Sequence, residues 1–292
     1  MKLPRVDHRE QSKHLPTVAD SPFVRVRQQA DAVGTSRQEL NRLWWERLPM
    51  TYADWEAKSR LPNPQEVTTR LTGVYLANNP FLRLRFDFAT FAGKRVLEIG
   101  CGAGAAACLF ATGGARVTAI DITDQAVDLT RQAAEILGLT IDVRPMDAEH
   151  MDFADDSFDF VYTWGVIHHS QNTEAVVAEI ARVLRPGGRV LCMVYNRDSL
   201  RYWLKGLYWL LVRGKVAQGY GFGSVQRFYT DGYYHRHFSK REFVRLFARE
   251  GMTLERLSIT HMAKRMIRIA PRSIDEWLKD HAGWLMVGEF CR

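Results

Sequence analysis

The chain has 292 residues, 46% of them apolar, which is enough for one large α/β domain with added segments or for two small domains. Its 40 basic and 33 acidic residues give a net charge of +7, but the two signs are interspersed, as on an ordinary solvated surface. The sequence shows neither the apolar core of a signal peptide nor a run of about 20 apolar residues, so we expect a cytoplasmic protein.

The four cysteines, at positions 101, 108, 192 and 291, are widely scattered. They form no Cys-x-x-Cys pair and no Cys/His spacing of the kind that a zinc site or a disulfide framework needs. We expect reduced thiols and no metal site.

The first part of the chain contains two different segments. Residues 1–38 mix charged residues, Gln and Pro with little periodicity, which predicts a poorly ordered arm. Residues 39–93 begin with clustered aromatic residues such as Trp44 and Trp45 and continue with several prolines, so we expect short helices joined by turns. This second segment is predicted to form an N-terminal helical cap.

From residue 94 onward, short runs of β-forming residues alternate with helical stretches, which indicates a parallel sheet with helices on both of its faces. In chain order, the expected strands are 95–99, 116–120, 141–144, 158–163, 189–195, 252–260 and 284–290, and the expected helices are 104–112, 124–137, 173–184, 199–213 and 240–250. We interpret residues 185–188, Arg-Pro-Gly-Gly, as a turn. The predicted domain covers 94–292.

Two stretches of this domain are predicted to be lid insertions, around 197–238 and 261–282. In the expected helix at 199–213, apolar and aromatic residues recur at helical spacing, and basic residues such as Arg201, Lys205 and Arg213 flank them. Such a helix could cover a substrate pocket. A less favoured alternative is that the helix rests on a membrane interface and collects a lipid-like substrate.

A glycine-rich run follows the first strand of the domain. The strand ends near Glu98, and Gly100-x-Gly102-x-Gly104 then leads into a helix, which allows a ligand to approach the backbone closely. With Ala105, the same run also satisfies the spacing of dinucleotide-binding loops, so the glycines alone leave a nicotinamide cofactor open.

Two acidic residues lie at the ends of the next two strands. Asp121 is placed to accept hydrogen bonds from both hydroxyls of a ribose, and Asp147 could accept one from an adenine amino group. Alternatively, Asp121 caps a helix and Asp147 is a plain loop carboxylate. Three such signals at consecutive strand ends together favour an adenosine-containing ligand.

The motifs Val-Leu-Glu-Ile-Gly-Cys-Gly-Ala-Gly at 96–104, Val-Thr-Ala-Ile-Asp at 117–121, Met-Asp-Ala at 146–148, Ser-Phe-Asp at 157–159 and Leu-Arg-Pro-Gly-Gly-Arg at 184–189 stand in this order. This series resembles class I S-adenosylmethionine-dependent methyltransferases, in particular bacterial members that act on small molecules and whose acceptor is undefined. The resemblance implies a Rossmann-like sheet of seven strands in the order 3-2-1-4-5-7-6, the last of them antiparallel.

The resemblance also assigns roles around S-adenosyl-L-methionine. It implies that Gly100, Gly102 and Gly104 line the methionine portion and that Glu98 orients the loop and the ammonium group of the cofactor. It further implies that Asp121 and Ile122 hold the ribose and the adenine and that Asp147 and Ala148 contact the adenine edge. Trp164 would lie beside the reactive methyl group. In addition, Tyr52 belongs to an aromatic block that loosely resembles the cofactor-covering segment of some bacterial methyltransferases.

The histidine pair His168 and His169 follows the fourth expected strand. It resembles the paired histidines of many bacterial small-molecule methyltransferases, in which one ring can deprotonate or orient a hydroxyl or amine. The alternative is that these rings only cap or pack the adjoining helix.

Polar residues of the first insertion are candidates for the substrate pocket, because they are more polar than a core requires. With Tyr52, the candidates are Tyr229, Tyr233, His235 and His237, and Asp231 lies among them in the sequence. The alternative is that the aromatic rings pack the insertion onto the sheet.

We therefore expect an enzyme that transfers a methyl group to oxygen or nitrogen of a natural-product, sugar or lipid-like small molecule. Two alternatives stay open: a nicotinamide-dependent oxidoreductase, although no Tyr-x-x-x-Lys pair is present, and an inactive cofactor-binding interaction protein. The absence of an Asn-Pro-Pro-Tyr motif and of a recognisable RNA-binding module disfavours a nucleic-acid acceptor. The oligomeric state does not follow from the sequence.

Overall fold

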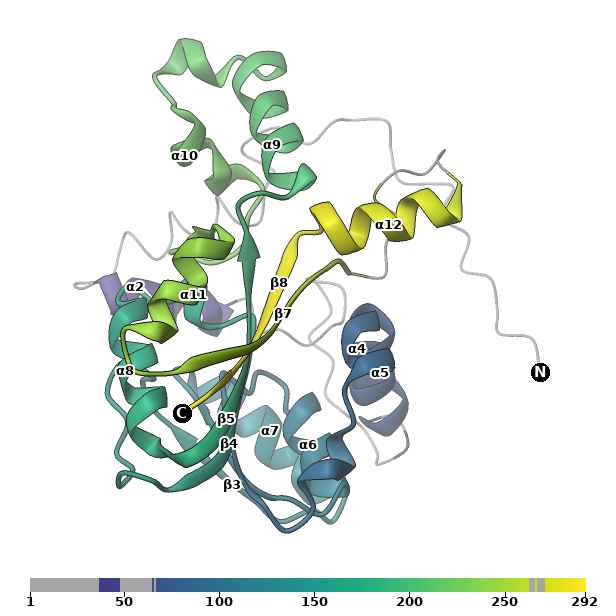
Figure 1. Cartoon of the computed structure of the whole chain (residues 1–292), viewed down its shortest axis with the longest axis vertical. Coiled ribbons are helices and arrows are strands. Elements are labelled where there is room, and N and C mark those ends of the chain that lie inside the picture. The colour runs from purple at the N-terminus through teal and green to yellow at the C-terminus, as the bar shows by residue number, and fades with distance from the viewer. Residues whose placement is uncertain (1–36, 48–64, 66, 263–265, 267–270) are drawn as a thin grey trace.

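The computed structural model of the chain describes residues 37–47, 65, 67–262, 266 and 271–292. One central sheet organises these residues, and its strands follow the order β3-β2-β1-β4-β5-β8-β7, with β6 pairing β5 (Figure 1). The strands are β1 Arg95–Ile99, β2 Arg116–Asp121, β3 Ile141–Pro145, β4 Phe158–Trp164, β5 Leu184–Asn196, β6 His237–Phe238, β7 Thr253–Thr260 and β8 Leu285–Cys291.

The inner strands are apolar on both faces because helices cover both sides of the sheet, as expected for a parallel sheet. In β5, Leu191 and Met193 belong to the apolar cluster on one face, whereas Val190 and Cys192 belong to the cluster on the other. Successive residues thus point to opposite faces of the sheet, and because both faces are buried, the strands appear as continuous hydrophobic runs in the sequence.

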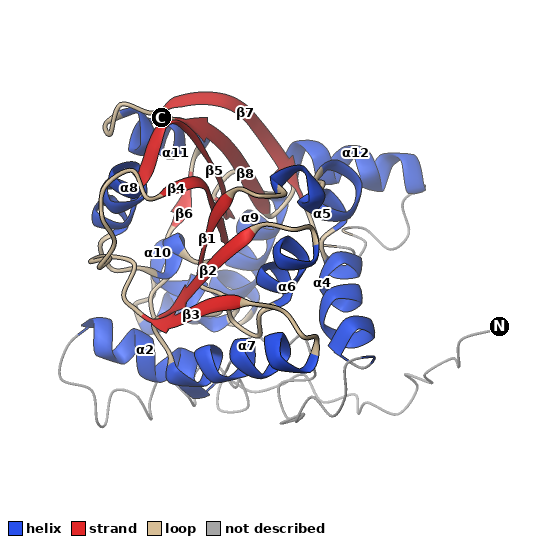
Figure 2. Ribbon diagram, turned by 90° about the horizontal axis from the view of Figure 1, so that it is seen from below, coloured by secondary structure: helices blue, strands red, loops and turns tan. Residues whose placement is uncertain are grey.

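Helices form a layer on each side of the sheet (Figure 2). The core on one side includes residues of α4, α5, α6, α7 and the 3-10 turn η3, and the core on the other side includes residues of α8 and α11. The bounds are α4 Gly73–Asn78, α5 Pro80–Arg85, η3 Phe88–Phe91, α6 Ala105–Thr112, α7 Asp124–Ile136, α8 Thr173–Val183 and α11 Lys240–Ala248. The expected helices at 104–112, 124–137, 173–184 and 240–250 are thus confirmed, with small differences at their ends.

The carboxyl-terminal strands complete the sheet as the family resemblance implies. β8 runs antiparallel to both β5 and β7 and lies between them. Counting only the seven long strands, this is the order 3-2-1-4-5-7-6, so the predicted topology is confirmed. The two-residue strand β6 is an addition that the sequence pattern did not indicate.

Two local predictions differ from the structure. Residues 185–188 belong to β5 rather than to a separate turn, because the amide of Gly187 donates to the carbonyl of Arg292 and the amide of Arg292 donates to the carbonyl of Gly188. The expected helix at 199–213 is α9 Leu200–Leu207 followed by a π-helical turn, η5 Tyr208–Val212. The α-helix and the π-helical turn after it form one continuous helical segment, so the spacing of apolar residues in the sequence does not distinguish them.

The insertion after β5 extends beyond the end of the sheet, where α9 and α10 Phe222–Val225 stand apart from the other helices (Figure 1). The 3-10 turns η6 Lys215–Gln218 and η7 Gln226–Phe228 connect the rest of the insertion, and the second insertion contains α12 Arg272–Ala282. Before the sheet, α2 Arg37–Arg47 lies along α7 (Figure 2), and the π-helical turn η2 Val67–Thr72 leads into α4. The division of the chain into arm, cap and methyltransferase domain stays a prediction, and residues 1–36 lie outside the described residues.

Candidate active site

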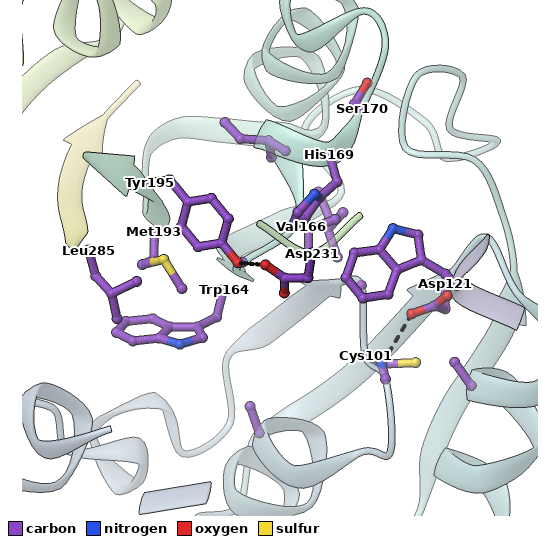
Figure 3. Close-up of a pocket in the computed structure, with 18 of the residues that line it drawn as sticks. Cys101, Asp121, Trp164, Val166, His169, Ser170, Met193, Tyr195, Asp231 and Leu285 are labelled. Atoms are coloured by element: carbon purple, nitrogen blue, oxygen red, sulfur yellow. Dashed lines mark hydrogen bonds between the residues drawn. The ribbon is translucent and has the colours of Figure 1, made fainter. Parts of the chain in front are cut away.

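A cavity of about 720 Å³ lies at the carboxyl ends of the central parallel strands. Its wall includes residues 99–103 after β1, 120–123 after β2, 146–148 after β3 and 164–167 after β4. This is the edge where ligands bind in open α/β sheets, because the strand order reverses there. Figure 3 shows side chains from these strand ends and from the insertion converging on one space.

The glycine-rich loop forms the floor of the cavity. Gly100 and Gly102 line it, and their φ angles of 76° and 55° lie in the left-handed region that favours glycine. A Cβ atom on Gly100 would lie 2.2 Å from Cγ2 of Val166, so this position also excludes any side chain by contact. Gly104 differs from the expectation, because it does not line the cavity but forms the N-cap of α6, where a Cβ atom would press on Thr130.

Asp121 ends β2 and faces the loop across the cleft. One of its oxygens accepts from the amide of Gly102 at 3.1 Å, and the other accepts from the amide and the hydroxyl of Thr123 at 3.0 and 2.9 Å (Figure 3 shows the first contact). Burial raises the pKa of Asp121, and these hydrogen bonds oppose that shift. The carboxylate is thus held in a fixed orientation on the cavity wall, with lone pairs left to accept further hydrogen bonds. Ile122, the next residue, also lines the cavity.

Asp147 lies on the same wall after β3, together with Ala148. Both of its carboxylate oxygens are 3.0 Å from Nε2 of Gln38, which belongs to α2, and Oδ1 also accepts from the amide of Glu149. An amide nitrogen therefore already donates to the carboxylate that we expected to accept from an adenine amino group. The contact spans 109 residues of sequence, and nothing in the local pattern around Gln38 indicates it.

Glu98, near the end of β1, lines the cavity and is 5% exposed. Burial raises its pKa well above the ordinary value, and the nearby charge of Asp121 adds to the shift. Among the described residues, Oε2 of Glu98 has no hydrogen-bond partner. A buried carboxylate oxygen left in this state is destabilising unless a cationic or donor group meets it.

Trp164 ends β4 on the opposite side of the cavity. Its indole nitrogen donates to Oδ1 of Asn79 at 3.2 Å, and its ring lies parallel to that of Tyr162 at 6.3 Å. Both contacts fix the indole, which lines the cavity (Figure 3). Its position beside a reactive methyl group stays a prediction.

The two histidines have different environments. His168 is fully buried, does not line the cavity, and packs its ring 3.9 Å from that of Tyr195. His169 lines the cavity, with Nδ1 at 2.9 Å from the carbonyl oxygen of Tyr234 and its ring edge-on to Trp45 at 4.8 Å. The structure therefore separates the pair: His169 faces the ligand space, and His168 is a packing residue behind it.

An acidic residue of the insertion approaches His169 in the middle of the cavity (Figure 3). Asp231 accepts a hydrogen bond of 2.7 Å from the hydroxyl of Tyr195, and its charge favours the protonated form of His169. Burial nevertheless lowers the pKa of His169 below its ordinary value, so the ring is neutral at neutral pH. Tyr195, the second-last residue of β5, was missed because a tyrosine within a strand is expected to belong to the core.

The predicted substrate-pocket residues also differ in whether they line the cavity. Tyr229 lines the cavity and donates from its hydroxyl to the carbonyl of Tyr202. In contrast, Tyr233, His235 and His237 do not line the cavity, so of the polar residues singled out in this insertion the structure brings Tyr229 and Asp231 to the wall. Their rings pack instead: Tyr233 packs near Trp44, and His235 and His237 lie 5.8 Å apart. Tyr52 lies outside the described residues.

The rest of the cavity is mainly apolar. It extends past Met193 and Leu285 to residues of both insertions, among them Arg201 and Lys205 of α9 and Met262. Each insertion thus contributes to the wall, and the role of a lid stays a prediction. On the outer side of the first insertion, large apolar side chains are exposed, including Leu211 at 65% and Val212 at 72%. Contact of this surface with a membrane stays a prediction.

No cluster of three or more His, Cys, Asp or Glu residues suited to hold a metal occurs in the described part of the chain, and all four cysteines are free thiols. Within the same residues, no helix combines the length and apolarity required to cross a bilayer.

The comparison with protein families decides the nature of the central segment. A family model described as "Methyltransferase domain" matches residues 97–192, which run from β1 through most of β5. Together with the sheet order, this match identifies the fold. The chain contains a class I methyltransferase domain.

Curated relatives of this methyltransferase domain are similar over the same region. A ubiquinone biosynthesis O-methyltransferase of Thiobacillus denitrificans is 36% identical over 129 residues, which are 43% of this chain and 55% of the relative. A 27-O-demethylrifamycin SV methyltransferase of Amycolatopsis mediterranei is 35% identical over 156 residues, which are 52% of each chain. The chain spans about half the length of the curated relatives it matches.

Solved structures share the fold over a larger part of the methyltransferase domain and its additions. A SAM-dependent methyltransferase of Methanosarcina mazei has a TM-score of 0.50 at 20% identity, covering 70% of this chain and 95% of its own. A SAM-dependent methyltransferase of Aquifex aeolicus has a TM-score of 0.50 at 15% identity, covering 79% of this chain and 98% of its own. At these identities the likeness concerns the fold alone.

Proposed function

We propose that this chain transfers a methyl group from S-adenosyl-L-methionine to an oxygen of a small-molecule acceptor. One observation carries the proposal: a single cavity joins the loop at Gly100, Asp121 and Asp147 to an apolar chamber, and His169 lines it between the two parts. A cofactor and an acceptor bound in such a cavity would meet inside the protein, away from water.

The residues of the wall fit this cofactor. The unpartnered Oε2 of buried Glu98 would be satisfied by the ammonium of the methionine portion, and the lone pairs of Asp121 would accept from the ribose hydroxyls. Asp147 and Ala148 would hold the adenine edge, and Trp164 would flank the methionine end. When bound, S-adenosylmethionine supplies an electrophilic methyl group on a positively charged sulfur.

His169 is suited to accept the proton of a hydroxyl acceptor. A carbonyl oxygen can only accept a hydrogen bond, so Nδ1, which lies 2.9 Å from the carbonyl of Tyr234, carries the proton of the neutral ring. The lone pair of the ring is therefore on Nε2. Because burial keeps His169 neutral, Nε2 can act as a general base at neutral pH.

Asp231 and Tyr195 assist this base as positioning residues. The negative charge of Asp231 stabilises His169 after it has taken up a proton, since the carboxylate favours the protonated ring. The hydrogen bond of 2.7 Å from the hydroxyl of Tyr195 keeps Asp231 in place. The base thus comes from the 3-10 turn Ile167–His169 after β4, and its stabilising charge comes from the insertion.

The acceptor is proposed to be a natural-product, sugar or lipid-like molecule. The apolar side chains of Met193, Trp284 and Leu285 in the cavity favour a molecule with an apolar body. Two relatives support transfer to oxygen of such a molecule, because one is named a ubiquinone biosynthesis O-methyltransferase and the other a 27-O-demethylrifamycin SV methyltransferase.

Calorimetric titration with S-adenosylhomocysteine tests the cofactor site without an acceptor. We expect binding by the unaltered protein, and an affinity lower by about 10- to 100-fold in Asp121→Ala, because a ligand hydroxyl loses a charged acceptor. Asp128→Ala is the matched control, because this aspartate is exposed on α7 and does not line the cavity. Equal affinities of the two variants would contradict the proposed site, and binding of nicotinamide dinucleotides in place of S-adenosylhomocysteine would overturn the assigned cofactor.

A further inference from the structure

Helix α9 presents two cationic side chains to the acceptor part of the cavity. Arg201 and Lys205 both line it, and their spacing of four residues places them on the same face of the helix. Side chains of like charge at this spacing repel each other. Their position therefore needs a compensating interaction.

The described residues supply no anionic partner for this pair, only contacts with aromatic rings and one carbonyl oxygen. Arg201 lies over the ring of Trp284 at 4.8 Å, and its one hydrogen bond, to the carbonyl of Tyr229, is long at 3.4 Å. Its Nε is buried and has no partner among the described residues. The Nζ atom of Lys205 lies 5.8 Å from the ring of Tyr229, and no ion pair of Arg201 or Lys205 is formed within this part of the chain.

The positive charge of Arg201 also acts on its neighbours. Lys205 is an exposed residue, but partial desolvation of its ammonium group, together with Arg201, lowers its pKa to about 8; the same guanidinium contributes to the lowered pKa values of His237 and His261. Asp231, the acidic residue that the same insertion contributes to the wall, accepts a hydrogen bond from Tyr195 and forms no ion pair with either cation among the described residues. The two cations of α9 thus outnumber the one carboxylate that this insertion brings to the wall, which leaves an excess of positive charge there.

We propose that Arg201 and Lys205 bind an anionic group, a carboxylate or a phosphate, of the acceptor molecule. The inference rests on the proposed function and specifies its substrate class: an apolar molecule that carries a hydroxyl at one end, near His169, and an anion at the other. The surrounding side chains Trp284, Leu204 and Leu285 contact the apolar body. A bound anion would satisfy the buried Nε of Arg201 and remove the repulsion between the two cations.

Three phenyl probes with and without charge test the subsite: 4-hydroxybenzoate, phenyl phosphate and the neutral 4-hydroxybenzamide. Each is titrated into the protein at constant ionic strength, with and without S-adenosylhomocysteine, and the dissociation constant is read from the thermal midpoint. We expect at least one anion to bind more tightly than the amide, by about 10- to 100-fold. The stronger anion identifies the group as carboxylate or phosphate, and equal affinities of all three probes, or no binding, overturn the proposal.

Charge-removing variants locate the effect. In Arg201→Gln and Lys205→Gln, the preference for the anion should fall about 10-fold or more, whereas Arg201→Lys should retain part of it. The matched controls are Arg241→Gln and Lys240→Gln, which change exposed residues of α11 that do not line the cavity. Without any ligand, Arg201→Gln should also raise the thermal midpoint, because it removes the repulsion, and a lowered midpoint with unchanged anion affinity would show a purely structural residue.

The anion titration and the cofactor titration test the two proposals independently of each other. If S-adenosylhomocysteine does not bind but the anion preference depends on Arg201, the cofactor proposal fails and the subsite remains. If the reverse is observed, the chain keeps its proposed function and the anionic acceptor is refuted.

Discussion

Replacing Gly100 permits a quantitative prediction, because a side chain there would reduce stability in two separate ways, by backbone strain and by overpacking. In Gly100→Ala, the φ of 76° imposes strain of about 1–2 kcal/mol on an alanine. The new Cβ would also lie 2.2 Å from one methyl group of Val166 and 2.9 Å from the other, and overpacking of this kind costs about 1–3 kcal/mol. The free energy of unfolding should therefore fall by roughly 2–5 kcal/mol.

Gly138→Ala is the matched control for this variant. Gly138 has a φ of 64°, but a Cβ atom there would meet nothing within 4 Å. Both variants gain the same small benefit from a less flexible unfolded chain, about 0.4–1 kcal/mol. The difference between them isolates the contact with Val166.

Urea denaturation of the two variants measures this difference, and calorimetry with S-adenosylhomocysteine reports on the loop. Gly100→Ala should be less stable than Gly138→Ala by about 1–3 kcal/mol and should bind the ligand more weakly, since Gly100 lines the cavity. Adding Val166→Ala to Gly100→Ala should restore part of the stability. Equal stability of the two single variants, with unchanged ligand affinity, would refute the close approach between loop and Val166.

Three further predictions concern titratable residues. His169→Gln should lower kcat by about 10²- to 10⁴-fold in an assay of S-adenosylhomocysteine release while leaving the affinity for that product unchanged, and a similar loss in His168→Gln would contradict the separate roles of the two rings. Glu98→Gln should raise the thermal midpoint at pH 7, because burial disfavours the charged form of Glu98. This stabilisation should vanish below pH 4.5, where the carboxyl is protonated in the folded and in the unfolded chain. The same variant should weaken binding of S-adenosylmethionine. Burial lowers the pKa of His168, His169 and His237, so the unfolded chain binds protons first and stability should decrease as pH falls below about 6.5; a thermal midpoint independent of pH between 7 and 5 would contradict this reasoning. Because the folded ring of His169 stays neutral at this pH, kcat should decrease only when pH falls further, through the lowered pKa of His169.

Much of the central fold follows from local pattern. β1, β2 and β4 are short, largely apolar runs that end in a polar residue or are followed by a glycine, and burial on both faces of the sheet makes such runs easy to recognise. The same locality explains why the positions of Asp121 and Asp147 on the cavity wall could be predicted, since Asp121 ends β2 and Asp147 lies two residues after β3.

The acceptor side depends on contacts between distant segments, and it was predicted less well. Tyr195 and Asp231 are 36 residues apart, and only the folded insertion brings them together. Arg201 and Lys205 read as basic flanks of an amphipathic helix, because helical spacing does not show that the insertion turns this face toward the cavity. His168 and His169 are adjacent in sequence, so no pattern could tell which ring faces inward.

Helix α2 has a consequence for the order of events during turnover. Gln38 near its start contacts Asp147, and Trp45 near its end contacts His169. The two contacts lie about 10 Å apart along a single helix, so they span the cleft from the adenine end to the base. A rigid element that touches both ends cannot uncover one without disturbing the other. Departure of the spent cofactor and of the methylated product would then be a single opening event, and its rate would set a common upper limit for the exchange of both.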